Sequence, residues 1–262
     1  MLARLRNILV FLTVEQWRAI DEDMMDRPLP NRQVLGAMVM VAVALIVGAY
    51  FGNPRFINKF PAVRAWFAVQ PYPSLCPRLY WAAFKTVYYF GIPALYIRFV
   101  IKDRIWDYGF KFSTNGKVWA LYGLMLLVVL PLTYAVSYSP QFLATYPKYK
   151  HAGVSLGQFF AWEAAYGYQF LMLEIFFRGL ALFLLARYIG SAAIFVMIIP
   201  YAMIHFAKPL PETAGSIIAG MALGTIALRT RSIYGGVMVH CAVAWCMDIF
   251  AMMRKGQLNF DG

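Results

Sequence analysis

The chain has 262 residues, of which 61% are hydrophobic and only 14% are charged, and its mean hydropathy is +0.60. This composition excludes an ordinary soluble domain, in which roughly a quarter of the residues carry a charge. The formal net charge of +12 does not indicate nucleic-acid binding, because the Lys and Arg residues stand singly between long apolar runs and form no basic stripe. We expect this charge to attract the headgroups of anionic membrane lipids.

Residues 1–33 contain one short apolar stretch, from Ile8 to Val14. No small-residue cleavage site follows it, and the mixed charges from Glu15 to Arg32 favour a helix lying on the membrane surface over a secretory signal. The sequence therefore predicts an N-terminal cytoplasmic or interfacial segment over residues 1–33.

The rest of the chain alternates long apolar runs with short polar connections. Because a spanning helix needs about 20 apolar residues, these runs predict about seven membrane spans. They are Val34 to Gly52, Trp81 to Ile101, Val118 to Tyr138, Gly157 to Tyr188, Ser191 to His205, Thr213 to Leu228 and Ile233 to Met253. The expected fold is an all-α, polytopic transmembrane helical bundle with an N-terminal interfacial helix. Three accessory spans and their loops occupy residues 34–155, and residues 156–262 form a second helical region.

Two charged residues lie deep inside the fourth apolar run. Glu174 and Arg178 are four residues apart, which places them one turn from each other on the same face of a helix. A charged side chain at the bilayer centre costs about 2.5 to 3.5 kcal/mol, so such residues usually face the interior of a helix bundle. The pair is either a structural salt bridge or part of a functional site.

Two of the three histidines lie in the same half of the chain. His205 ends the fifth span and His240 lies within the seventh, so helix packing can bring both towards Glu174. A desolvated carboxylate can take a proton from water, whereas an imidazole can donate to an oxyanion or bind a metal. Hydrolysis inside a membrane needs both functions, and we expect Glu174, Arg178, His205 and His240 to share one cavity.

Three motifs on successive predicted helices give this half of the chain a specific resemblance. They are Glu174-Ile-Phe-Phe-Arg178, Tyr201-Ala-Met-Ile-His205 and His240-Cys-Ala-Val-Ala244. Over roughly Gln158 to Met253, the order and spacing resemble the motifs EExxxR, FxxxH and HxxxN of the CPBP (CAAX protease and bacteriocin-processing) family of intramembrane endopeptidases. The resemblance implies a helical bundle around a conical, water-filled cavity that cleaves membrane-associated peptides, such as prenylated CAAX tails, bacteriocin precursors or lipoproteins. It also implies catalytic roles for Glu174, His205 and His240, with Arg178 and Tyr201 in support. Asp248, two turns beyond His240 on the same helix face, is a further supporting candidate.

Two positions depart from the family motifs. The family's water-activating Glu is replaced by Leu173, and the Asn that assists the oxyanion is replaced by Ala244. A carboxylate from Glu174, Glu163 or Asp248 could compensate for the missing base. The alternative is a catalytically impaired relative that acts as a peptide-binding, immunity or scaffolding membrane protein.

Cofactor chemistry is left open by the sequence. The three cysteines show no CxxC spacing, so neither a disulfide framework nor a Cys-ligated metal is expected. If a divalent metal such as zinc takes part, its ligands are expected to be Glu174, His205 and His240. A transporter is the weakest functional class, because the candidate site residues are confined to one half of the chain and no internal repeat is present. The expected location is a multi-pass position in a bacterial inner membrane.

Overall fold

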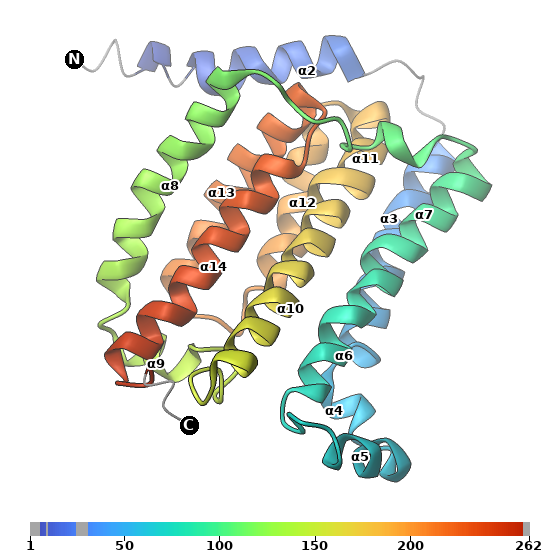
Figure 1. The fold of residues 1–262 in the computed structure, drawn as a ribbon. Coiled ribbons are helices and arrows are strands. Elements are labelled where there is room, and N and C mark those ends of the chain that lie inside the picture. Colours follow the sequence, from blue (N-terminus) through green and yellow to red (C-terminus); the bar gives the residue numbers. More distant parts are fainter. Residues whose placement is uncertain (1–5, 9, 25–30, 259–262) are drawn as a thin grey trace. The chain divides into compact units, whose positions relative to one another are not determined.

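The computed structural model describes residues 6–8, 10–24 and 31–258. All regular elements in these ranges are helical, and the one recorded β-bridge, between Phe110 and Ser232, is isolated (Figure 1). The predicted all-α fold class is therefore confirmed. The surface position expected for residues 1–33 stays a prediction, although residues 11–24 do form the helical segments η1 (Phe11–Glu15) and α2 (Gln16–Met24).

Within the described residues, five helices are long and apolar enough to cross a membrane. These are α3 (Asn31–Tyr50), α8 (Gly116–Val136), the continuous helix of residues 156–189, α13 (Leu210–Thr230) and α14 (Tyr234–Arg254). In α3 the candidate span covers Arg32–Tyr50. The helix of residues 156–189 consists of α10 (Leu156–Glu174), η5 (Ile175–Leu180) and α11 (Ala181–Ile189). The chain is thus a multi-pass integral membrane protein.

The other two expected spans have a less regular form. The first consists of α6 (Cys76–Lys85), η2 (Thr86–Gly91), α7 (Ile92–Leu95) and η3 (Tyr96–Ile101), in which η2 and η3 are π-helical. Pro93 lies between the two wide segments, where its missing N–H removes one bond of the helical ladder. The second is α12 (Ala192–Met203), which is short and contains Pro200. Short connecting helices are α4 (Pro54–Ile57), α5 (Pro61–Ala68), η4 (Ile105–Asp107) and α9 (Pro140–Thr145).

The helices form two compact units that interleave along the chain. Unit 1 contains residues 1–42, 92–114 and 174–236, and unit 2 contains residues 43–91, 115–173 and 237–262. The boundaries predicted at residues 33/34 and 155/156 were drawn from the sequence pattern, whereas the two units are defined by contacts between residues. The predicted boundaries therefore stay predictions.

In unit 1, α12 packs along α13 through two glycines of α13 (Figure 1). A Cβ atom at Gly220 would lie 2.9 Å from Ile198, and one at Gly224 would lie 3.3 Å from Ile194. The absence of side chains at these positions lets the helix backbones approach closely.

Helix α2 also belongs to unit 1 and contacts α11 and α13. The indole Nε1 of Trp17 donates to Thr225 at 3.2 Å, and the carboxylate of Asp21 accepts from the backbone N–H of Ser191. Because Ser191 is the residue before α12, Asp21 satisfies one of the N–H groups that a helix N-terminus leaves without an intrahelical partner.

Candidate functional site

The first component of the site is a buried ion pair on the longest helix. Glu174 ends α10 and Arg178 lies in η5, with 3.3 Å between Arg178 Nη1 and Glu174 Oε1. The two side chains are 0% and 3% exposed. The pairing predicted from their four-residue spacing is confirmed. Arg178 lies in a π-helical segment, a form of wide turn that is frequent at functional sites.

A glycine of α14 makes room for the Glu174 carboxylate. Gly236 lies in the first turn of α14, and a Cβ atom at this position would collide with Oε2 of Glu174. The N-terminal turn of a helix carries partial positive charge and stabilises a nearby anion. Glu174 therefore lies next to both a cation and the first turn of a helix, two neighbours that stabilise negative charge.

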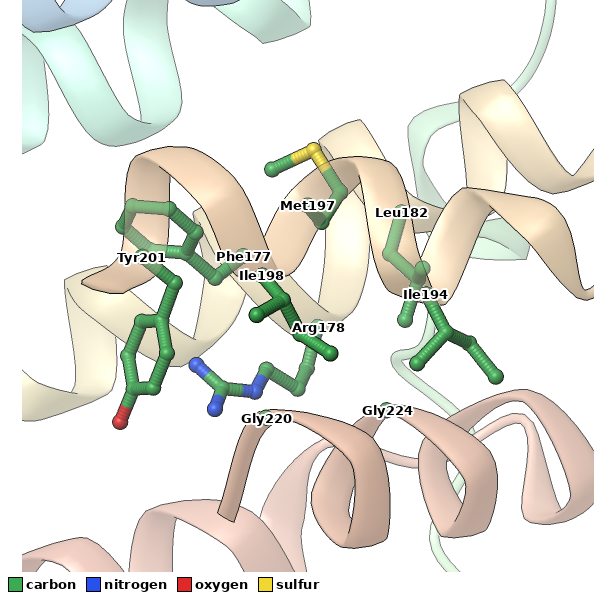
Figure 2. A pocket seen from close by; sticks show the side chains of 9 residues that line it. All are labelled: Phe177, Arg178, Leu182, Ile194, Met197, Ile198, Tyr201, Gly220 and Gly224. Atoms are coloured by element: carbon green, nitrogen blue, oxygen red, sulfur yellow. The ribbon is translucent and has the colours of Figure 1, made fainter. Parts of the chain in front are cut away.

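The ring of Tyr201 connects this ion pair to the first histidine motif. The Arg178 guanidinium carbon lies 3.9 Å from the centre of the Tyr201 ring, as Figure 2 shows for the two side chains. On α12, the Tyr201 ring also makes an edge contact with His205, with 4.8 Å between ring centres. Glu174, Arg178, Tyr201 and His205 consequently form one continuous chain of contacts within unit 1.

The end of α12 determines how His205 is held. The backbone N–H of His205 bonds to the carbonyl of Ala202, three residues earlier, so the carbonyl of Tyr201 accepts instead from the imidazole Nδ1 of His205 at 2.7 Å. A carbonyl oxygen can only accept, so Nδ1 must carry the proton and a neutral imidazole has its lone pair on Nε2. The carbonyl of His205 in turn accepts from the hydroxyl of Thr213 in α13 at 2.8 Å. The histidine is therefore fixed through both its ring and its backbone.

A small cavity lies beside Arg178, and its volume is about 10 Å³. It is lined mainly by apolar side chains of η5, α11 and α12 and by two glycines of α13, with Tyr201 at one end (Figure 2). The residues that line it are Phe177, Arg178, Leu182, Ile194, Met197, Ile198, Tyr201, Gly220 and Gly224. This volume admits about one water molecule, so the cavity is too small to hold a peptide. It is a packing void behind the guanidinium and not a substrate site.

Comparison with known proteins supports the assignment that the motifs suggested. Residues 153–246 match a protein-family model named Rce1-like. Its description reads 'Type II CAAX prenyl endopeptidase Rce1-like'. The predicted CPBP-family resemblance is confirmed. Neither the curated proteins nor the solved structures gave a match to the chain. The matched CPBP region includes Glu174, His205 and His240, whereas Asp248 lies beyond its end.

The remaining residues predicted for the CPBP site belong to unit 2 and are described within it. The imidazole of His240 stacks on the ring of Phe170, with 5.4 Å between ring centres and 6° between planes. Asp248 is fully buried and accepts hydrogen bonds from Trp162 and from the backbone N–H of Lys148. The convergence of His240 on the residues of unit 1 stays a prediction.

The two positions that depart from the CPBP motifs are both buried. Leu173 is 4% exposed and Ala244 is 3% exposed, so apolar side chains occupy the sites where family members carry Glu and Asn. In the described part of the chain, no group of three His, Cys, Asp or Glu side chains is placed to hold a metal. A metal ligand set of Glu174, His205 and His240 therefore stays a prediction.

Three contacts of the site were not anticipated from the sequence. Gly236 beside Glu174 had a weak signal in the Gly235-Gly236 pair at the start of the last span. The hydroxyl bond from Thr213 and the carbonyl bond from Tyr201 had none, because both depend on how tightly the end of α12 turns.

Proposed function

We propose that this protein is an intramembrane endopeptidase of the CAAX-protease type, which hydrolyses peptide bonds in membrane-associated proteins or peptides. The observation that carries the proposal is the fixed position of His205 within the family-matched region. Its imidazole donates to the Tyr201 carbonyl, and the Tyr201 ring connects it to the Glu174–Arg178 pair. Prenylated CAAX tails, bacteriocin precursors and lipoproteins are the substrate classes that the resemblance implies.

In the proposed mechanism His205 activates the attacking water. With Nδ1–H donated to the Tyr201 carbonyl, Nε2 of the neutral ring can accept a proton. Water gives that proton to Nε2 while its oxygen bonds to the scissile carbonyl carbon, and the carbonyl electron pair moves to oxygen. When the C–N bond breaks, the imidazolium returns the proton to the leaving nitrogen. No separate carboxylate base is needed at position 173.

The Glu174–Arg178 pair has a supporting role in this mechanism. Glu174 has Arg178 and the first turn of α14 as partners, so we assign it to holding the guanidinium against Tyr201. His240 is assigned by resemblance to stabilising the oxyanion. If a divalent metal takes part, it would supply Lewis-acid polarisation of the scissile carbonyl.

The proposal is tested with the full chain in lipid nanodiscs and a panel of prenylated and unmodified fluorogenic peptides. His205→Ala should reduce kcat/KM by about 10² to 10⁴-fold, the usual contribution of general acid–base catalysis. The matched control is His151→Ala, which removes an exposed histidine of unit 2. Mass spectrometry should identify one peptide bond cut by the wild type and by His151→Ala.

Two further results would revise the proposal. Equal activity of His205→Ala and wild type, with both folded, would remove His205 from the chemistry. Loss of wild-type cleavage on chelation, restored by added zinc, would assign the activation of water to a metal instead of to the imidazole alone.

A further inference from the structure

Two tryptophans tie α10 to α14 in unit 2. The indole Nε1 of Trp162 donates to the Asp248 carboxylate at 2.7 Å, and the indole Nε1 of Trp245 donates to the backbone carbonyl of Glu163 at 2.9 Å. Trp162 precedes Glu163 on α10, and Trp245 lies one turn before Asp248 on α14. The two bonds therefore place Glu163 and Asp248 at the same level of the helix pair.

The negative charge of Asp248 is compensated by its surroundings. Its side chain is 0% exposed, and besides the Trp162 bond it accepts the backbone N–H of Lys148 at 3.0 Å. The side chains of Lys148, Lys150 and Lys255 also interact with it electrostatically. Burial opposes the charged form of Asp248, and these hydrogen bonds and lysines offset part of that cost.

Glu163 has a different environment. Its side chain is 7% exposed, and both carboxyl oxygens are buried without a hydrogen-bond partner among the described residues. The charged neighbour with which it interacts is Asp248. An anion at Glu163 would be desolvated and would repel the adjacent carboxylate, which makes the charged form costly.

We propose that Glu163 and Asp248 form a proton-binding carboxyl pair. A proton bound by Glu163 stabilises the contact between α10 and α14, and we call this stabilisation the latch. A proton fits the donor set better than a metal ion, because no third His, Cys, Asp or Glu in the described chain completes a ligand group. The proposed cleavage mechanism gives no chemical role to either residue. Loss of the proton places two anions side by side in a medium of low dielectric and loosens the contact between the helices.

The latch acts on the helix pair that carries the second histidine motif. Phe170 lies two turns after Glu163 on α10, and His240 lies two turns before Asp248 on α14. The stacking of Phe170 on His240 therefore depends on the same helix contact. Other titratable groups surround the pair besides the three lysines named above. The rings of Tyr149 and Tyr166 contact Trp162. The Nζ atom of Lys85 lies 4.8 Å from the ring of Trp81, which stacks on Trp162.

Infrared spectroscopy of the full chain in nanodiscs tests the proton directly. A carbonyl stretch of a protonated carboxyl group should be present at neutral pH and should disappear in Glu163→Gln. The control Glu22→Gln, at an exposed position of α2, should leave the band unchanged. A band that persists in folded Glu163→Gln would overturn the proposal.

Thermal unfolding tests the latch. The wild-type melting temperature should fall as the pH rises from neutral to alkaline, because a proton bound only in the folded state is lost, whereas Glu163→Gln should show a smaller fall. Equal falls in the two proteins would overturn the latch. If Glu163→Gln does not fold, the wild-type spectrum decides: a protonated-carboxyl band lost at alkaline pH supports the proposal, and its absence at neutral pH overturns it.

Discussion

The backbone carbonyl of Tyr201 accepts a hydrogen bond from Nδ1 of His205 at 2.7 Å. This bond exists because the end of α12 tightens and directs the N–H of His205 to Ala202 instead. The same tyrosine contacts Arg178 through its ring, so one residue orients the histidine and covers the guanidinium. Its backbone and its ring therefore have separable roles.

Tyr201→Phe should keep the ring contacts and the backbone bond. The ring stays against Arg178 and His205, the bond to Nδ1 comes from the backbone, and the variant loses the interaction of the hydroxyl group with Arg178. We expect Phe to retain kcat/KM within a few-fold, whereas Tyr201→Leu should lose the cation–π contact, worth about 0.5 to 2 kcal/mol. Peptide cleavage and thermal unfolding of the two variants measure the difference. If Phe and Leu cause the same loss, the hydroxyl group must be the functional part of the side chain.

Arg178→Ala should destabilise the protein strongly. Removing one partner of a buried ion pair costs about 3 to 5 kcal/mol, because the other charge is left without compensation. The control is Arg231→Ala, since Arg231 is 35% exposed and its bridge to Asp23 is a surface pair, worth about 0 to 1 kcal/mol.

Denaturant unfolding in detergent compares the two arginine variants, and the double change Glu174→Gln with Arg178→Met should recover part of the loss. Wild-type stability of Arg178→Ala would mean that the pair is solvated.

Gly236→Ala should also destabilise the protein, although alanine normally favours a helix over glycine. The added Cβ atom would collide with the Glu174 carboxylate, and overpacking of this kind costs about 1 to 3 kcal/mol. Gly215→Ala is the matched control, because no atom lies within 4 Å of the added Cβ and a helical Gly to Ala change gains about 0.5 to 1 kcal/mol. The two variants should therefore shift the melting temperature in opposite directions. A stabilising Gly236→Ala would show that Glu174 does not lie against α14.

The features that could be predicted from the sequence are those with a local signal. Apolar run lengths located five long helices, and the four-residue spacing of Glu174 and Arg178 predicted their ion pair. The hydrogen bonds of His205 could not be predicted, because they depend on a tightened helix end and on the packing of α13 against α12. The bond between Trp162 and Asp248 joins residues 86 positions apart, and neither residue type specifies the other.

Leu173 stands where the CPBP motif carries its first Glu. Leu173 is 4% exposed, so Leu173→Glu buries a new carboxylate next to Glu174 and should lower stability. A carboxylate at the family's base position should also raise the cleavage rate above that of the wild type, because a second group can then take the proton from water. Leu173→Gln is the matched control: it should lose similar stability without the gain in rate.

Rates measured on the peptide panel, with melting temperatures for each variant, separate the possible outcomes. A slower Leu173→Glu with an active wild type would mean that His205 already acts as the base and that the new charge disturbs it. In that case Glu174→Gln, Glu163→Gln and Asp248→Asn should each retain cleavage, and loss in one of them would identify a carboxylate base. If neither wild type nor Leu173→Glu cleaves any peptide while both are folded, the protease proposal fails. A peptide-binding membrane protein would then be the better description.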